Sequence, residues 1–327
     1  MPSPDSASAS SSLVSVVLPT YKRPDFLDRA IASIFEQTHR HWELIVVDDN
    51  NELDEYRLDT QAFMQRFAGD ARVRYVQHSR NLGGAAARNT GISDARGDFV
   101  AFLDDDDEWH PGKLQAQLEA FDRAGPNVGV VYSGIEAIDA STGTSHVTRP
   151  SRQGALYPQI LAHNHIGSTS CLLCRRNLLF QIGLFDESLA AAQDYDLFIR
   201  LAQVSDFAHV DRVLVRRHKH AGERITQNFR AKIAAFEAIH LKHQRVLQTH
   251  PRILSSFLFI KARLHMAAGD HTGAARVFAA AYRLNPTRVA LLAYWFFASV
   301  GVSGYDAARL STRPIRLWVH RLIHENR

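Results

Sequence analysis

The chain has 327 residues, of which 46% are hydrophobic and 22% are charged, as in ordinary globular proteins of one or two domains. This composition excludes an intrinsically disordered chain, a collagen-like repeat and a disulfide-rich miniprotein. The net charge of +4 and the lack of Lys/Arg blocks argue against a nucleic-acid-binding protein, although mild basicity suits a phosphorylated ligand or an anionic membrane surface.

The N-terminal segment, residues 1–12, is rich in Ser, Ala and Pro and lacks the charged and apolar regions of a signal peptide. It predicts a short disordered leader. No apolar run reaches the roughly 18 residues of a membrane-spanning helix, and two cysteines, Cys171 and Cys174, cannot form a disulfide framework. We therefore expect a cytoplasmic protein, with peripheral contact at the cytoplasmic face of a membrane as an open alternative.

Short apolar runs alternate with helical patterns in the first third of the chain. The runs predict strands covered on both faces at residues 14–19 and 42–47, a short strand at 73–77 and a fourth strand at 99–103. Apolar residues at helical spacing predict helices at residues 25–36, 58–67 and 83–95. This alternation is typical of βαβ units and of a mostly parallel, Rossmann-like sheet flanked by helices.

The pattern changes twice further along the chain. The elements expected next are a helix at 113–123, a strand at 128–132, a strand or hairpin region at 135–154 and a largely helical segment at 183–202. After about residue 230 strand patterns disappear, and helices are expected at 228–248, 253–268, 272–284 and 287–300. We place a domain boundary near residue 226. It gives an α/β domain at 13–226, with halves at 13–110 and 111–226, and an all-helical C-terminal extension at 227–327.

Acidic residues follow two of the predicted strands at the point where each strand ends. Asp48 and Asp49 come directly after one buried run, and the acidic run at residues 104–108 comes directly after another. Since ligands of such sheets bind at the carboxyl ends of the strands, both clusters are candidate functional residues.

The five carboxylates at residues 104–108 predict a metal site. Neighbouring carboxylates repel one another, and Mn²⁺ or Mg²⁺ would relieve the repulsion because hard divalent cations prefer oxygen ligands. An EF-hand is excluded, since Trp109 stands where that loop needs glycine and Gln115 where it needs glutamate. A solvated acidic loop is the alternative.

Two glycines, Gly83 and Gly84, open the predicted helix at residues 83–95, and Arg88 lies one turn into it. Such a helix N-terminus attracts a diphosphate, although the spacings of dinucleotide-binding and Walker loops are absent. A tight turn with close helix–sheet packing is the alternative.

Together these segments resemble the family 2 glycosyltransferases of the GT-A fold. The resemblance rests on five motifs in order, which read VSVVLPTYKRPDFLDRAIASIFEQT from Val14, WELIVVDDN, NLGGAAARNTG, GDFVAFLDDDDEWHPGKL, and IGLFDESLAAAQDYDLFIRLA from Ile182. It covers roughly the first 225 residues. It implies a nucleotide-sugar donor, a divalent metal ion and transfer with inversion at the anomeric carbon.

The resemblance also implies roles for individual residues. Asp48 or Asp49 would hydrogen-bond the nucleotide base. In the family's DxD motif Asp106 would be the direct metal ligand, together with Asp104, and His218 is a further metal candidate, with ordinary surface polarity as its alternative. The residues implied in nucleotide-sugar binding are Pro19, Thr20, Tyr21, Asp48, Asp49, Arg88, Asp104 and Asp105.

The family's catalytic base lies in a motif that reads QDYDL from Gln193 here, with glutamine in place of the usual glutamate. We carry the base role to Asp194 only. Inversion needs a carboxylate that takes the proton of the acceptor hydroxyl, while a metal neutralises the departing diphosphate. Capping of a helix N-terminus is the alternative role for Asp194 and Asp196.

Other features predict structure rather than chemistry. Cys171 and Cys174 have CxxC spacing but no second pair, so we interpret them as buried thiols rather than a zinc or redox site. Residues 268–286 resemble one tetratricopeptide-type helix pair, which is weak evidence because solenoids need several. Residues 289–302 predict a buried or interfacial helix. Residues 313–327, basic and apolar, predict docking on the preceding helices, with an anionic bilayer as the alternative.

The residues and the resemblance together predict a metal-dependent inverting glycosyltransferase. It would move a sugar, in the first instance from a UDP-linked donor, to a hydroxyl of a glycan or lipid-linked acceptor in cell-surface polysaccharide or lipopolysaccharide synthesis. Two alternatives remain open. One is a catalytically inactive nucleotide-sugar-binding protein, which Gln193 makes conceivable, and the other is a scaffold that acts through its helical C-terminal region.

Overall fold

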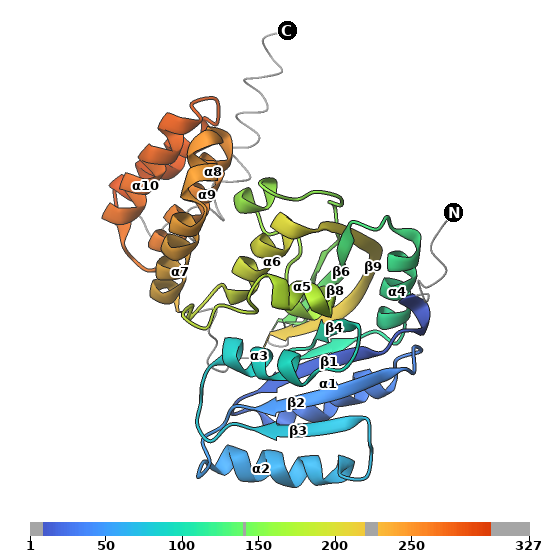
Figure 1. The fold of residues 1–327 in the computed structure, drawn as a ribbon. Helices are drawn as coiled ribbons and strands as arrows, with labels where there is room; N and C mark the ends of the chain where they lie inside the picture. The colour runs from blue at the N-terminus through green and yellow to red at the C-terminus, as the bar shows by residue number, and fades with distance from the viewer. Residues whose placement is uncertain (1–8, 140–141, 220–227, 302–327) are drawn as a thin grey trace. The chain divides into compact units, whose positions relative to one another are not determined.

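The structure, a computed structural model, describes residues 9–139, 142–219 and 228–301 (Figure 1). One compact unit holds the described residues up to 219, except residues 161–163. The other holds those three residues and the described residues from 228 onwards. The first unit contains the sheet and the second consists of helices.

Nine strands of the described residues form one mixed sheet. They are β1 (Val14–Thr20), β2 (Trp42–Asp48), β3 (Val73–Gln77), β4 (Phe99–Phe102), β5 (Asp107–Trp109), β6 (Val128–Asp139), β7 (Thr144–Thr148), β8 (Leu172–Arg175) and β9 (Asp206–Lys219). The α-helices of this unit are α1 (Pro24–Phe35), α2 (Glu55–Met64), α3 (Gly84–Asp94), α4 (Lys113–Arg123), α5 (Arg176–Gln181) and α6 (Gln193–Val204). Short 3₁₀ helices lie at Ala9–Ser11, Gln65–Phe67, Gln159–Ala162 and Thr169–Cys171.

The strand order is β3-β2-β1-β4-β8-β6-β9-β5, and β7 pairs with β6. The first four strands in this order are parallel, whereas β8 runs antiparallel to β4 and β6 (Figure 1). From β1 the chain moves outward to β2 and β3 and then returns to β4 on the other side of β1. This reversal makes the carboxyl ends of β1 and β4 a topological switch point, the place where open α/β sheets have their ligand-binding crevice. The predicted α/β class with a helical C-terminal region is confirmed.

The central strands are buried on both faces, as their continuous apolar runs predicted. In β1, Val16, Val17 and Leu18 have no exposed surface. α3 approaches this strand so closely that a Cβ atom at Gly91 would lie 2.3 Å from Val17 Cγ1. Glycine at this position therefore lets α3 lie directly against β1, beside the crevice.

The segment at residues 183–202 is helical only in its second half, as part of α6, so the prediction of a largely helical segment is wrong for its first half. Leu184 and Ala192 have positive φ angles of 63° and 54°, which no helix contains. Arg200 on α6 donates a hydrogen bond to the carbonyl oxygen of Leu184 at 2.6 Å. The loop therefore folds back along α6, and its apolar side chains produced a helix-like spacing.

Two other parts of the first unit differ from the predictions. β9 was not predicted, because most of its side chains are half-buried or exposed and several are charged. The leader was predicted to include residues 9–12, but Ala9–Ser11 form a 3₁₀ helix. The backbone N–H of Ala9 donates to Asp122 Oδ1 on α4 at 2.7 Å, which fixes this segment to the domain.

The second unit contains α7 (Phe229–Lys242), α8 (Gln244–Thr249), α9 (Pro251–Ala267), α10 (His271–Leu284) and α11 (Ala290–Ser299). The helix predicted at 228–248 is divided at His243, where φ is −112° and ψ is 15°. The core of α9, α10 and α11 includes Ala262, Phe278 and Leu291.

Only one side of α11 is buried. Leu291 and Ala298 face the core, and the large apolar side chains exposed on or beside this helix are Val289, Leu292, Trp295, Phe296 and Val300. No helix in the described part of the chain is both long and apolar enough to cross a bilayer. Residues 313–327, for which we predicted docking or membrane contact, lie outside the described residues.

Candidate active site

The carboxyl ends of β1, β2 and β4 bring predicted site residues to one edge of the sheet. Thr20 lies beside Asp48 in the β1–β2 register. The backbone N–H of Leu103 donates to the carbonyl oxygen of Val17 at 3.1 Å, so the chain leaves β4 alongside β1. The acidic run begins at the next residue, Asp104, and therefore starts in the crevice.

Asp105 anchors the acidic run to β1. Its side chain is buried, its Oδ2 accepts a hydrogen bond from Thr20 Oγ1 at 3.0 Å, and its Oδ1 lies 3.2 Å from Arg23 Nη1. Burial raises the pKa of Asp105 to about 7, although Arg23 opposes this shift. The Thr20 hydroxyl therefore donates its hydrogen bond to Asp105. Of the other two residues predicted with it, Tyr21 is 38% exposed and Pro19 is partly buried in β1.

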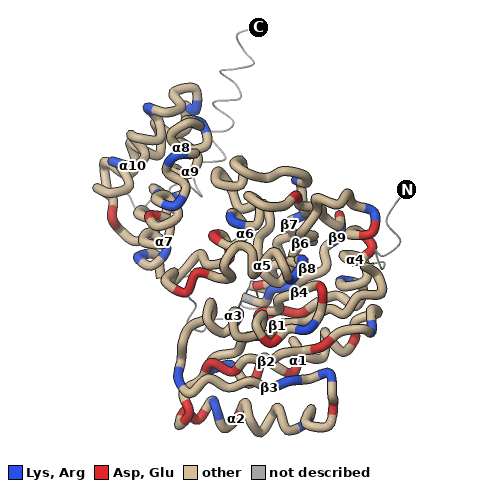
Figure 2. The backbone as a smooth tube through the Cα atoms, in the orientation of Figure 1, with Lys and Arg blue, Asp and Glu red and all other residues tan. Residues whose placement is uncertain are grey.

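Asp104 and Asp106 are both partly accessible to solvent. Their side chains are 30% and 19% exposed. Asp104 Oδ1 lies 2.6 Å from Arg88 Nη2, and Asp106 Oδ2 lies 3.1 Å from Arg23 Nη1. Figure 2 shows the resulting mixture of acidic and basic segments around β1 and β4.

The last two acids of the run, Asp107 and Glu108, have different surroundings. Asp107 is fully buried, and burial, followed by the charges of Asp104 and Asp106, raises its pKa well above the usual range. Glu108 Oε1 lies 3.5 Å from His218 Nε2. The structure thus places His218 beside Glu108. Within the described residues, no three His, Cys, Asp or Glu side chains are already arranged to hold a metal.

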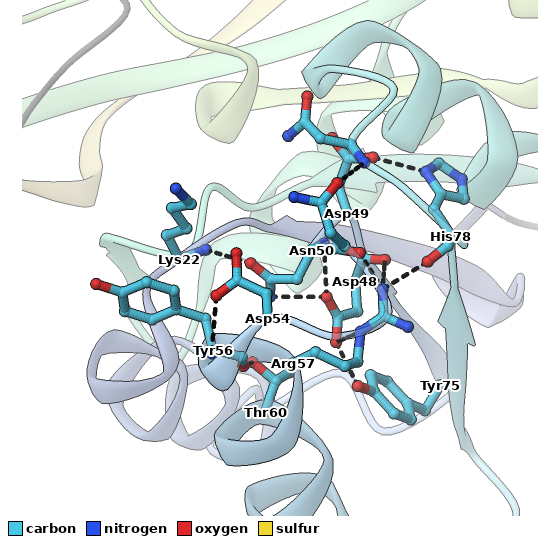
Figure 3. Close-up of polar contacts among 12 residues, drawn as sticks. Lys22, Asp48, Asp49, Asn50, Asp54, Tyr56, Arg57, Thr60, Tyr75 and His78 are labelled. Atoms are coloured by element: carbon cyan, nitrogen blue, oxygen red, sulfur yellow. Dashed lines mark hydrogen bonds and ion pairs between the residues drawn. The ribbon is translucent and has the colours of Figure 1, made fainter.

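Asp48 is fully buried in a network of polar contacts (Figure 3). Its Oδ2 accepts from the Tyr75 hydroxyl and lies 3.0 Å from Arg57 Nε. Its Oδ1 accepts from the backbone N–H and Nδ2 of Asn50 at 2.9 and 2.8 Å. Arg57 also donates to the carbonyl oxygen of His78 at 2.6 Å. Asp48 therefore joins β2, β3 and α2 and offers little acceptor capacity to a nucleotide base.

Asp49 holds the loop that leads into α3 (Figure 3). Its Oδ1 accepts from the backbone N–H of Leu82 at 2.8 Å and lies 2.7 Å from His78 Nδ1. Its Oδ2 accepts from the backbone N–H of Gly83 at 2.8 Å. His78 Nε2 in turn lies 2.9 Å from Thr90 Oγ1 on α3. A carboxylate has about four acceptor positions, so a further donor can bind Oδ2, and this aspartate is the better candidate of the two for a base contact.

The start of α3 is shaped around Arg88. Gly83 has φ of 93°, which favours glycine and turns the chain into the helix. A Cβ atom at Gly84 would lie 3.1 Å from Arg88 Nη1, so glycine leaves room for the guanidinium group. Asn89 accepts from the backbone N–H of Phe185 at 2.9 Å and donates to its carbonyl oxygen at 3.0 Å. These bonds join α3 to the loop that precedes α6.

Asp194 lies in the first turn of α6. Burial raises the pKa of its carboxyl group, whereas the backbone N–H of Tyr195, which donates to Oδ1 at 2.8 Å, and the charge of Arg88 oppose the shift and the charge of Asp104 reinforces it. The start of α6 lies near Arg88, because a Cβ atom at Gly84 would lie 3.1 Å from Arg88 Nη1 and 3.9 Å from Gln193 Oε1. The N-cap of α6 is Ala192, whose side chain has no capping oxygen and whose left-handed conformation is costly for a residue other than glycine.

The neighbours of Asp194 make structural contacts. Gln193 Nε2 donates to the carbonyl oxygen of Leu189 at 2.7 Å. Asp196 is fully buried, and its Oδ2 accepts from Arg200 Nε at 2.7 Å. Asp196 thus orients the arginine that fixes the preceding loop.

Sequence reasoning missed several residues that shape the site. Arg23 pairs with two acids of the run, and Ser170 Oγ accepts a hydrogen bond from the backbone N–H of Asp104 at 3.2 Å. Neither belongs to a pattern that periodicity reveals, because each contact joins distant segments. Cys171 and Cys174 are free and fully buried, as predicted, and burial raises the pKa of Cys171 to about 12.

Comparison with known protein families shows to which family this chain belongs. The sequence model of glycosyl transferase family 2 matches residues 15–183, which is more than half of the chain. The chain belongs to this family.

Among relatives of this family 2 protein, the uncharacterized glycosyltransferase RP339 of Rickettsia prowazekii (strain Madrid E) is 31% identical over 221 residues, which cover 65% of this chain and 66% of that protein. The putative colanic acid biosynthesis glycosyl transferase WcaA of Escherichia coli (strain K12) is 31% identical over 191 residues, 58% of this chain and 66% of that protein. The chain therefore spans just under two thirds of the length of these curated relatives.

Two solved structures show a similar fold. Residues 1–349 of TarS from S. aureus, in complex with UDP-GlcNAc, match with a TM-score of 0.63 at 18% identity, over 90% of this chain and 92% of that one. The mannosyltransferase PcManGT from Pyrobaculum calidifontis, in complex with GDP-Man and Mn²⁺, matches with a TM-score of 0.52 at 21% identity, over 91% and 86%. At these identities the likeness concerns the fold alone, and it supports the predicted GT-A class.

Proposed function

We propose that this family 2 protein is a metal-dependent inverting glycosyltransferase that moves a sugar from a nucleotide-sugar to a hydroxyl group. One observation carries the proposal. A Cβ atom at Gly84 would lie 3.1 Å from Arg88 Nη1 and 3.9 Å from Gln193 Oε1, so α6, which carries Asp194, begins beside the arginine that pairs with Asp104. A base, an acidic motif and a cation for the diphosphate are the parts that this transfer requires.

The donor would lie across the carboxyl ends of β1 and β2 and the start of α3. The exposed ring of Tyr21 is available to the base, and Asp49 Oδ2 accepts one hydrogen bond at present. Arg88 and the N-terminus of α3 supply positive charge and N–H donors for the diphosphate. The buried Asp48, paired with Arg57, would keep this edge of the site in place.

Mn²⁺ or Mg²⁺ would be held by Asp106 and Asp104. Both residues present partly exposed carboxylate oxygens, the donors that hard cations prefer. Each carboxylate is already paired with a guanidinium group, so this part of the crevice stabilises positive charge. When bound, the metal would neutralise the charge that develops on the departing diphosphate. We leave His218 out of the ligand set because it lies beside Glu108.

Asp194 would act as the general base. It would take the proton of the acceptor hydroxyl as that oxygen attacks the anomeric carbon from the face opposite the leaving diphosphate. A raised pKa makes an ionised carboxylate a better proton acceptor, and burial raises that of Asp194. The sugar–phosphate bond breaks as the new glycosidic bond forms, so the anomeric configuration inverts.

The acceptor would be a glycan or lipid-linked hydroxyl in the synthesis of a bacterial cell-surface polysaccharide. The name of the E. coli relative, which refers to colanic acid biosynthesis, supports this class. UDP-linked sugars are the first donors to test, with GDP-linked sugars next, because TarS and PcManGT are described with UDP-GlcNAc and GDP-Man respectively.

A donor screen tests the proposal. The full chain is incubated with UDP-, GDP- and dTDP-sugars, with Mn²⁺, with Mg²⁺ and with EDTA, while binding and release of the nucleoside diphosphate are measured. We expect one nucleotide class to bind and its release to require the metal. Binding without release or transfer to any glycan acceptor would indicate the inactive nucleotide-sugar-binding protein instead.

A further inference from the structure

Arg23 bridges two carboxylates of the acidic run. Its Nη1 lies 3.2 Å from Asp105 Oδ1 and 3.1 Å from Asp106 Oδ2. Arg23 is also the N-cap residue of α1, a position where Ser, Thr, Asp or Asn is preferred, and its side chain makes no capping hydrogen bond. The guanidinium group is directed to the acids rather than to the helix.

Arg88 makes the matching contact with Asp104, the first acid of the motif. Its Nη2 lies 2.6 Å from Asp104 Oδ1, and its side chain is 15% exposed. The two carboxylates that the proposed function assigns to the metal, those of Asp104 and Asp106, are thus each neutralised by an arginine, Arg88 from α3 and Arg23 from the start of α1.

A divalent cation and a guanidinium group cannot both lie next to the same carboxylate without strong like-charge repulsion. A metal that arrives alone would have to displace Arg23 and leave that charge without a partner. A diphosphate changes this situation because its oxygens accept the paired N–H groups of arginine. The arginine can then leave the carboxylate as the metal arrives.

We propose that Arg23 is a resident counter-ion that couples metal binding to donor binding, by releasing Asp106 only when a nucleoside diphosphate is present. The inference rests on the proposed function. Thermodynamic linkage requires the coupling to be reciprocal, so the metal must raise diphosphate affinity by the same factor as the diphosphate raises metal affinity.

Lys22 provides the matched control. It is the residue before Arg23 in the same loop and carries the same charge, but its ammonium group lies over the rings of Tyr21 and Tyr56, at 5.3 and 5.9 Å from their centroids. Lys22→Gln therefore removes one positive charge from the loop without removing a contact to Asp105 or Asp106.

The test is a titration of the full chain with Mn²⁺, followed by electron paramagnetic resonance of the free ion, without nucleotide and with saturating UDP or GDP. We expect wild-type protein to bind Mn²⁺ about 10-fold or more tightly with one of the diphosphates, within the usual range of allosteric coupling. Arg23→Gln should bind Mn²⁺ alone about 10-fold more tightly than wild type, and the diphosphate should then raise Mn²⁺ affinity by a smaller factor than in wild type, because only the Arg88–Asp104 pair and direct metal–diphosphate contact remain. Lys22→Gln should stay within about twofold of wild type.

A second variant keeps the test decisive if Arg23→Gln lowers the melting temperature. Arg23→Lys keeps the charge, and we expect it to retain weak binding of Mn²⁺ alone. Unchanged Mn²⁺ affinity in folded Arg23→Gln, or equal coupling in this variant and wild type, would overturn the inference while leaving the proposed function intact. Absence of any Mn²⁺ or diphosphate binding to wild type would instead count against the proposed function itself.

Discussion

The proposed role of Asp194 as the general base gives the sharpest prediction for a single residue. Asp194→Asn keeps the size of the side chain but cannot take a proton at neutral pH. General-base assistance contributes roughly 10²–10⁴-fold, so the transfer rate should fall by about that factor. Donor affinity should barely change, because Tyr21, Asp49 and Arg88 supply the proposed donor contacts. Rate and donor binding are measured on the same preparation.

Two neighbouring positions serve as controls. Asp196→Asn weakens the ion pair with Arg200, so we expect it to lower the melting temperature more than Asp194→Asn does. Gln193→Glu replaces the amide that donates to Leu189 with an acceptor, so it should disturb the loop or shift the pH profile. Full activity in Asp194→Asn together with loss of activity in folded Asp196→Asn would show that the base is misassigned by two residues.

The pH dependence of wild-type protein gives a separate test of the same residue. Burial raises the pKa of Asp194, and the base must be ionised to accept a proton. The transfer rate should therefore fall on the acidic side at a higher pH than an aspartate of ordinary pKa, about 3.9, would give. The logarithm of kcat is followed from pH 4 to 8, and this acidic limb should be absent from the residual activity of Asp194→Asn.

At the same scale, the types of residue at the site could be predicted, but their partners could not. Asp48 and Asp49 were both predicted at the end of a strand, and the sequence offers no means to tell which is fully engaged. Their difference arises from Arg57 and His78, which approach from α2 and from the end of β3. Arg23 escaped notice because its charge acts on acids more than 80 positions away.

At the scale of elements, α4 contacts Trp109, the residue that follows the acidic run, through a buried lysine. Lys113 is fully buried, and its Nζ donates to Gln117 Oε1 at 2.8 Å and lies 3.9 Å from the ring centroid of Trp109. Trp109 Nε1 donates to the carbonyl oxygen of Ser170, the residue whose hydroxyl accepts from Asp104. Burial lowers the pKa of Lys113 to about 7.

This lowered pKa predicts a pH-dependent stability. In the unfolded chain a lysine has a pKa of about 10.4, so between pH 7 and 10 the unfolded chain holds a proton that the folded protein has lost. The free energy of unfolding therefore rises with pH in this window, by at most about 1.4 kcal/mol per pH unit. Wild-type protein should gain this stability between pH 7 and 9 relative to Lys113→Met, as measured by urea denaturation.

The matched control for this prediction is an exposed lysine. Lys22→Met should not alter the slope, because Lys22 stays charged in both states over the same pH range; its pKa is raised by its contact with Tyr21. A stability difference between wild type and Lys113→Met that is independent of pH would show that Lys113 keeps its proton in the folded protein.

Elements whose apolar residues recur at a regular spacing could be predicted from the sequence. Elements whose paths depend on contacts between distant segments of the chain could not. The strands β1, β2 and β4 follow from apolar runs, which a strand buried on both faces requires. The loop before α6 was mistaken for a helix because its buried Phe185 and Leu189 mimic helical spacing, whereas the hydrogen bonds of Asn89 and Arg200 fix an irregular path. β9 was missed because its charged residues interrupt the regular spacing of apolar side chains that predicts a strand.

At the scale of the whole molecule, every residue of the candidate site lies in the unit that contains the sheet. We therefore expect a chain ending at residue 226 to fold and to bind the selected nucleoside diphosphate with Mn²⁺ within about threefold of the full chain's affinity. Calorimetry of both chains checks this prediction. Loss of binding in a truncated chain that remains monomeric and folded would show that the helical unit is part of the donor site.

The central claim is that this crevice transfers a sugar with inversion, and the configuration of the first product tests it most directly. The full chain is given the α-linked nucleotide-sugar and the acceptor found in the donor screen, with Mn²⁺, and the anomeric proton of the newly formed glycosidic linkage is followed by NMR. A single base, Asp194, predicts a β-configured product from direct displacement. An α-configured first product would require a second displacement by another nucleophile, and it would contradict the account.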